Sequence, residues 1–100
     1  MNVWVVYDIE SSKEGNKRRS KIVKEIKKFG LYRVQKSVFA GNIENNRFDE
    51  LYIFSKNMID QQKDSVYIFP MCKADFEAVK LIGKGFDKDL ISGEKKEIFL

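Results

Sequence analysis

The sequence predicts a small α/β domain of the α+β class, in which two helices cover one face of a largely antiparallel sheet. Strand-like apolar runs alternate with stretches in which apolar residues recur at helical spacing. The elements follow in the order strand, helix, one or two strands, helix, strand and strand, which favours this layered arrangement. The length of 100 residues fits a single domain spanning residues 1–100, because no linker, internal repeat or low-complexity tract divides the chain.

The first strand is predicted over residues 2–9, where β-branched and aromatic residues predominate. Side chains alternate between the two faces of a strand, and here both faces are apolar until Asp8 is reached. Both faces of this strand should therefore be covered by other parts of the fold.

A helix is predicted over residues 14–29. Apolar residues at helical spacing would face the sheet, namely Ile22, Val23, Ile26 and Phe29. Lysines recur with the same period on another face, at Lys17, Lys21, Lys24 and Lys28. Ser12 or Asn16 could cap the beginning of the helix, and Gly30 lies where a left-handed C-terminal cap belongs. The segment therefore reads as an amphipathic helix with a basic ridge.

The middle of the chain is strand-like over residues 31–43, but no proline or glycine marks a turn before Gly41. One bent strand and two short strands meeting near Lys36 and Ser37 are both consistent with this pattern. A second helix is predicted over residues 47–61, with an apolar stripe along one side and Asn45 or Asn46 as its cap. The last part of the chain is expected to hold a strand, a short helical turn and two further strands, at residues 65–71, 74–79, 80–82 and 95–100.

Two helices can shield only one side of the sheet. Residues 3–7 and 66–69 nevertheless present large apolar side chains on both sides. We therefore expect a homodimer, in which a second copy of the sheet buries the other face. The C-terminal strand region, about residues 80–100, could lie along the edge of the partner's sheet.

The positive charge of the chain is concentrated in one segment. Residues 13–36 contain ten Lys and Arg against two acidic residues, whereas the rest of the chain contains nine basic and thirteen acidic residues. A positive field of this kind suits a polyanionic partner. The alternative is a lysine-rich helix that is simply exposed to water.

Cellular location follows from what the sequence lacks. The longest uninterrupted apolar run covers residues 3–7, far short of the roughly 18 residues that a membrane span needs. No secretory leader is evident, and a single cysteine, Cys72, cannot form an internal disulfide. We expect a cytoplasmic protein with no membrane partner.

Four segments together resemble the CRISPR-associated Cas2 family. They are the apolar strand MNVWVVYDI, the basic helix start KRRSK, the strand-like RVQKSVFAGN and the strand DSVYIFP, at residues 1–9, 17–21, 33–42 and 64–70. Their order and spacing cover about residues 1–72, and the length near 100 also fits. From Cys72 onward only the architecture matches.

The resemblance implies a ferredoxin-like βαββαβ sandwich that forms a homodimer through the open face of its sheet. It also implies a role in spacer acquisition (CRISPR adaptation), binding nucleic acid together with the CRISPR integrase. Family members are described as metal-dependent endonucleases acting on single-stranded RNA or, in some cases, on double-stranded DNA, and the expected cofactor is Mg²⁺ or another divalent cation. The alternatives are a catalytically silent dimeric DNA-binding scaffold and a stand-alone, toxin-like ribonuclease of the same fold.

Asp8 is the candidate catalytic and metal-binding residue. Its carboxylate ends an apolar strand, where burial costs free energy unless the charge is paired or holds a cation. The family places its metal-binding aspartate here, whereas the structural alternative is an aspartate that accepts hydrogen bonds from the following loop. Mg²⁺ can be held by two carboxylates with waters and phosphate oxygens, so two-fold symmetry could supply the second one.

The chain contains no histidine, which excludes a histidine general base and a Ser-His or Cys-His nucleophile system. Metal-activated water is then the best available nucleophile for phosphodiester cleavage. The expected phosphate contacts are Arg18, Arg19, Lys21 and Arg33. Ser37 and Phe39 also match the family pattern. Ser37 is a candidate nucleic-acid contact, and Phe39 is expected in the core or at the dimer interface.

Overall fold

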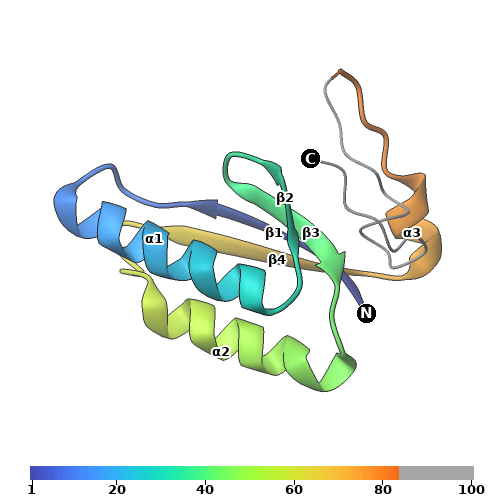
Figure 1. Cartoon of the computed structure of the whole chain (residues 1–100), viewed down its shortest axis with the longest axis horizontal. Helices are drawn as coiled ribbons and strands as arrows, with labels where there is room; N and C mark the ends of the chain where they lie inside the picture. Colours follow the sequence, from blue (N-terminus) through green and yellow to red (C-terminus); the bar gives the residue numbers. More distant parts are fainter. Residues whose placement is uncertain (84–100) are drawn as a thin grey trace.

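The computed structural model describes residues 1–83, which form a four-stranded antiparallel sheet in the order β2-β3-β1-β4 with two helices on one face (Figure 1). This is the predicted fold class. The elements are β1 (Asn2–Asp8), α1 (Lys13–Lys28), β2 (Tyr32–Gln35), β3 (Val38–Asn42), the 3₁₀ turn η1 (Asn45–Arg47), α2 (Phe48–Met58), β4 (Ser65–Met71) and α3 (Lys73–Ala78). The first strand lies inside the sheet and pairs with both β3 and β4.

The beginning and end of α1 follow the expected capping chemistry. Ser12 is the N-cap, and its hydroxyl accepts a hydrogen bond from the Gly15 amide at 2.9 Å. Gly30 has a φ of 87°, the left-handed conformation that glycine adopts without steric cost. Helix α1 therefore begins and ends within a residue of the predicted bounds.

The strand-like segment after α1 is a hairpin of two strands that turns at Lys36 and Ser37. The register shifts between Arg33 and Gln35, which marks a β-bulge beside the turn. Among residues 1–83 only glycines have a positive φ, so neither Lys36 nor Ser37 adopts a positive φ in this turn. Of the two alternatives, two short strands is therefore the correct one, and the turn between them needs no glycine.

Three local predictions were wrong. No side chain caps α2, which continues from the 3₁₀ turn, so neither Asn45 nor Asn46 has the predicted role. The helix ends at Met58 rather than near residue 61, because the backbone of Ile59 is extended. Residues 80–82 do not form a strand. The predicted strand over residues 95–100 lies outside the described residues.

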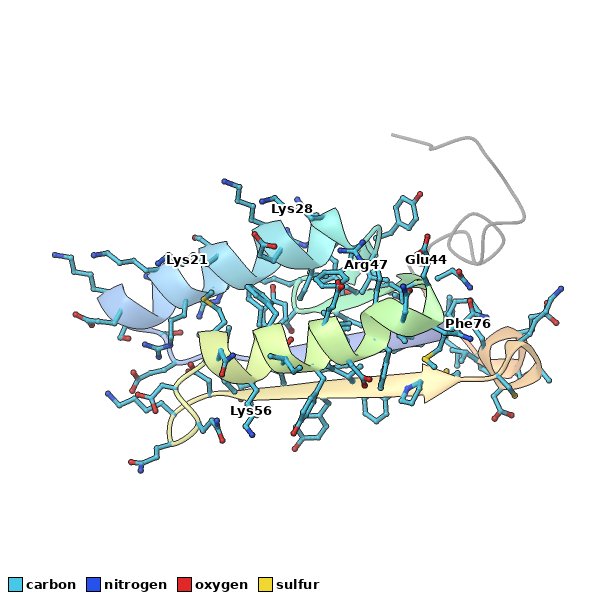
Figure 2. The ribbon with its side chains drawn as sticks, turned by 90° about the horizontal axis from the view of Figure 1, so that it is seen from below. Lys21, Lys28, Glu44, Arg47, Lys56 and Phe76 are labelled. Carbon is cyan, nitrogen blue, oxygen red and sulfur yellow. The ribbon has the colours of Figure 1, made fainter. Side chains whose placement is uncertain are left out.

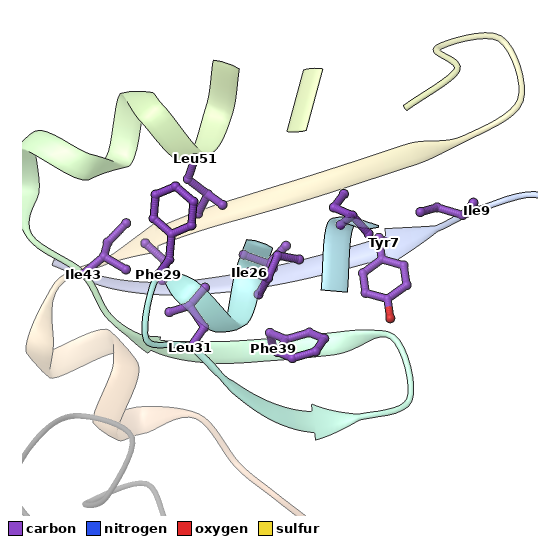
Figure 3. Packing of buried hydrophobic residues seen from close by; sticks show 11 residues of the cluster. Tyr7, Ile9, Ile26, Phe29, Leu31, Phe39, Ile43 and Leu51 are labelled. Atoms are coloured by element: carbon purple, nitrogen blue, oxygen red, sulfur yellow. The ribbon is translucent and has the colours of Figure 1, made fainter. Parts of the chain in front are cut away.

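The core lies between the sheet and the helices α1 and α2. Figure 3 shows Tyr7, Ile26, Phe39 and Leu51 converging in this layer. Phe39 faces the helices because it pairs with Val5, whose side chain is on the same face. Its exposure is 0%, so it belongs to the core of the subunit and has no surface left for a partner. Of the two places expected for Phe39, the core is therefore confirmed, and the dimer interface is corrected.

The opposite face of the sheet is covered in part by α3. Phe76 is fully buried and packs against Trp4, with ring centroids 6.2 Å apart. The expectation that a second copy of the sheet buries this face therefore applies only to the part that α3 leaves open, and the homodimer stays a prediction. Farther along, Tyr67 and Phe69 of β4 are 58% and 43% exposed. An apolar hollow of about 260 Å³ lies between Trp4, Val6, Phe69, Met71 and Val79.

The helices give no indication that the chain crosses a membrane. Among residues 1–83, none of them combines the length and the apolar character that a span across a bilayer requires.

Candidate active site

Asp8 is the last residue of β1 and lies opposite Ser65 of β4. Alternation along the strand places its side chain on the face of Trp4 and Val6, away from the helices. The carboxylate is exposed, so the expected burial cost does not arise. An exposed carboxylate at the rim of the open face is instead accessible to a cation or to a second copy of the chain.

A hollow of about 320 Å³ begins at Asp8. Its walls come from the end of β1 and the following loop, from α1, and from the β2–β3 turn. The lining residues are Tyr7, Asp8, Ile9, Ser11, Arg19, Lys36 and Ser37. The structure thus brings together Asp8, Arg19 and Ser37, three of the residues predicted for the site.

Tyr7 holds the β2–β3 turn against the end of β1. Its hydroxyl donates a hydrogen bond to the carbonyl oxygen of Lys36 at 3.1 Å, and its amide donates to the carbonyl oxygen of Ser37 at 3.1 Å. The ring is 4% exposed and stacks on Phe39, so core packing fixes the hydroxyl (Figure 3). In the sequence Tyr7 is only the last residue of the apolar run 3–7, so the place of its hydroxyl beside the site was not predicted.

Arg19 lies against the loop that follows Asp8. One terminal nitrogen (Nη1) donates to Asn16 Oδ1 at 2.7 Å, and the other (Nη2) donates to the carbonyl oxygen of Ile9 at 2.8 Å. A guanidinium has five N–H donors, so these bonds leave others for an anion in the hollow. Arg19 is therefore both fixed in place and able to hold a phosphate.

Arg18 has a different role from its neighbour. Its Nε donates to Asp64 Oδ2 at 2.6 Å, and its Nη2 donates to Oδ1 at 3.2 Å. The hydrogen bond from Arg18 is the main cause that lowers the pKa of Asp64 to about 2, against the opposing effect of burial. The same bond raises the pKa of Arg18. The ion pair directs Arg18 toward Asp64 rather than toward the hollow, and its role as a phosphate contact stays a prediction.

Two other predicted contacts lie outside the hollow. Lys21 is exposed on α1, and Figure 2 shows its side chain on the side of the helix away from the sheet. Arg33 is exposed on β2, with its guanidinium carbon 5.1 Å from the centroid of the Phe39 ring. Both remain predictions as phosphate contacts. Sequence reasoning missed Lys36, whose only signal was its position between Arg33 and Ser37 in the matched segment.

A single chain offers few ligands for a metal ion. Within residues 1–83, no group of three or more Asp, Glu or Cys side chains is placed to hold one. Asp8 is the only carboxylate lining the hollow, beside the hydroxyls of Ser11 and Ser37. Mg²⁺ keeps several waters and binds through one or two carboxylates plus phosphate oxygens, so this set fits it only in part without a second subunit.

Comparison with known proteins identifies the family. The family model described as CRISPR associated protein Cas2 matches residues 1–79. The chain belongs to the Cas2 family. The Cas2 relative from Desulforudis audaxviator, named a CRISPR-associated endoribonuclease, is 35% identical over 82 residues, covering 82% of this chain and 74% of the relative. A relative from Halalkalibacterium halodurans, named a CRISPR-associated endonuclease, is 36% identical over 70 residues, covering 69% and 72%.

Solved Cas2 structures share the fold. The crystal structure of Streptococcus pyogenes Cas2 at pH 6.5 superposes with a TM-score of 0.72 at 27% sequence identity, covering 83% of this chain and all 100% of that one. A second Cas2 crystal structure gives a TM-score of 0.60 at 27% identity, covering 100% and 98%. These similarities confirm the ferredoxin-like fold implied by the sequence, and the names of the relatives support nuclease activity.

Proposed function

We propose that this Cas2-family protein is a metal-dependent endonuclease of CRISPR adaptation, acting on single-stranded RNA or double-stranded DNA. The observation that carries the proposal is the polar hollow that joins the exposed Asp8 to Arg19 and Ser37. A carboxylate, a guanidinium and a hydroxyl are the groups needed to bind a cation and a phosphodiester side by side. The endoribonuclease and endonuclease names of the relatives support the same reaction.

Asp8 would hold the Mg²⁺ ion, together with the Asp8 of a second copy. The bound ion supplies charge stabilisation for the reacting phosphate and an acidified water as nucleophile. Arg19 and Lys36 bind the phosphate oxygens from the α1 and hairpin sides of the hollow. The hydroxyls of Ser11 and Ser37 orient the substrate by hydrogen bonding.

The open face of the sheet suits the dimerisation that a shared site requires. Tyr67 and Phe69 leave large apolar surface on that face, and Asp8 lies on the same side of the sheet. A second copy packed there would bury the aromatic side chains and bring two carboxylates toward each other. Enzymatic activity would then depend on the dimer.

Nucleic-acid binding also draws on the ridge of α1. The ridge consists of four exposed lysines, Lys17, Lys21, Lys24 and Lys28. Figure 2 shows Lys21 and Lys28 on the outer side of the helix, away from the sheet. Such contacts position a polyanion without reading its sequence. They suit a cytoplasmic protein that holds DNA for the CRISPR integrase.

A cleavage assay tests the proposed function. We expect the purified protein to cut single-stranded RNA or double-stranded DNA in Mg²⁺, to lose this activity in EDTA, and to regain it when Mg²⁺ is added in excess. Cleavage that persists in EDTA would contradict a metal-dependent reaction. Binding of DNA without cleavage of either substrate would identify the silent scaffold instead, and cleavage of cellular RNA without affinity for the integrase would identify the toxin-like ribonuclease.

Salt dependence tests the ridge. Lys21→Gln should reduce the slope of log affinity against log salt concentration by about 1, because one phosphate contact is lost. Lys56→Gln is the matched control, since Lys56 is an exposed lysine on α2. Affinity is measured by fluorescence anisotropy with a labelled duplex at several salt concentrations. Equal slopes for wild type and Lys21→Gln would contradict a phosphate contact at the ridge and identify it as a surface that is simply exposed to water.

A further inference from the structure

Asp64 lies where the loop after β1, helix α1 and the loop before β4 meet, and the first two of these segments line the candidate active site. Its side chain has an exposure of 0%. Oδ1 accepts hydrogen bonds from the Glu10 amide at 2.9 Å and from Arg18 Nη2 at 3.2 Å. Oδ2 accepts from Arg18 Nε at 2.6 Å and from the Asp60 amide at 2.9 Å. Glu10 and Arg18 are distant from Asp64 in the sequence, whereas Asp60 belongs to the same loop before β4.

The junction fixes the loop that follows Asp8. Glu10 is two residues beyond Asp8, and Asp64 is followed by Ser65, which pairs with Asp8 across the strands. Asp64 thus ties the backbone on the far side of Asp8 to the strand beside it. Through Arg18 the same carboxylate also ties this loop to α1.

The other side of the loop is held just as closely. Arg19 donates to the carbonyl oxygen of Ile9, and Ser12 caps α1. A Cβ atom at Gly15 would collide with the carbonyl oxygen of Glu10, so the helix backbone packs directly on the loop. The loop therefore has little freedom as long as the bonds to Asp64 are present.

We infer that Asp64 is a positioning residue, which acts through the Glu10 amide and Arg18 to hold Asp8 and the phosphate-binding Arg19 in their working arrangement. It does not line the hollow itself. The inference rests on the proposed function, because it assigns Asp64 a role in that site. An ion pair that only stabilised the fold would need no bond to the loop after Asp8. The hydrogen bond from the Glu10 amide to Asp64 is therefore what points to a positioning role.

Asp64→Asn removes the charge while keeping the size of the side chain. An amide has one acceptor oxygen, so it cannot receive bonds on both sides as the carboxylate does. We expect the amides of Glu10 and Asp60, which donate to Asp64, to exchange with solvent at least about tenfold faster, with little change in the middle of β1. We expect kcat to fall at least about tenfold and KM to stay within about twofold, because orientation is lost rather than binding.

Binding of Mn²⁺ alone gives a readout that does not depend on cleavage. Paramagnetic broadening of the amide signals around Asp8 should require a higher Mn²⁺ concentration in Asp64→Asn than in wild type. Asp49→Asn is the matched control, because Asp49 is an exposed aspartate in the first turn of α2. Arg18→Lys is a milder second variant, which keeps the positive charge but loses the two-pronged bond.

The outcomes separate the inference from the proposed function. Uniformly faster exchange with unchanged kcat and Mn²⁺ affinity per folded molecule, in both Asp64→Asn and Arg18→Lys, would overturn the positioning role. If wild type proves inactive on every substrate, the proposed function fails. The exchange and Mn²⁺ measurements then still decide whether Asp64 positions the loop beside Asp8.

Discussion

Asp8→Asn is expected to lower cleavage by at least about 1,000-fold while leaving the fold intact. The factor corresponds to about 4 kcal/mol of transition-state stabilisation, which is in the range that a bound metal ion supplies. Asparagine has the same size as aspartate but lacks the negative charge that attracts Mg²⁺. Because Asp8 is exposed at the end of β1, the substitution breaks no buried contact. The measurement is the single-turnover rate in Mg²⁺, with the melting temperature recorded in parallel.

Glu10→Gln is the matched control for Asp8→Asn. Glu10 is an exposed carboxylate in the loop that follows Asp8, where it accepts a hydrogen bond from Ser12 at 3.1 Å and lies 3.9 Å from the ammonium group of Lys63. We expect a change in rate of less than about threefold, since surface ion pairs contribute little free energy. Cleavage by Asp8→Asn at the wild-type rate would place the reaction at another site or in a contaminating enzyme.

The sequence predicted the elements whose periodicity is strong. The strand at residues 65–71 was predicted with the bounds of β4, because a β-branched and aromatic run there is bordered by turn residues. Helix α1 was within a residue at both ends, because Ser12 and Gly30 carry the capping chemistry. Local signals of this kind act over a few residues and can be read without knowledge of the fold.

The site was only partly predictable because its contacts span long stretches of sequence. Arg18 and Arg19 are adjacent and chemically identical, yet they point in different directions around the helix. Arg18 meets Asp64, a residue 46 positions away, whereas Arg19 meets the loop after β1. No local pattern separates the two roles. The family resemblance indicated both arginines, and only the tertiary structure divides them into an internal ion pair and a candidate phosphate contact.

The open face shows a similar limit. Apolar residues on both faces of β1 indicated that both were covered, but they did not show by what. The short helix α3 brings Phe76 onto Trp4, and a helix of six residues leaves little periodicity to recognise. The side on which Phe39 points was also undetermined, since it depends on the register with Val5.

Phe39→Ala is expected to destabilise the subunit itself by about 3–5 kcal/mol, a large share of the 5–15 kcal/mol typical of a whole domain. The ring is fully buried between the sheet and the helices, and it stacks on Tyr7 with centroids 6.3 Å apart. Its loss opens a cavity and also loosens the ring whose hydroxyl holds Lys36. The measurement is chemical unfolding, repeated over a range of protein concentrations.

Phe69→Ala provides the contrast that distinguishes a core residue from an interface residue. Phe69 is 43% exposed on the open face, so truncation should cost the isolated subunit less than about 1.5 kcal/mol. If a second copy covers this face, Phe69→Ala weakens self-association, and the unfolding midpoint then depends on protein concentration more steeply than in wild type. Phe39→Ala should instead lower the midpoint equally at all concentrations. The reverse pattern would return Phe39 to the interface between subunits and require a different pairing of the sheets, one in which the two Asp8 carboxylates no longer meet across the open face.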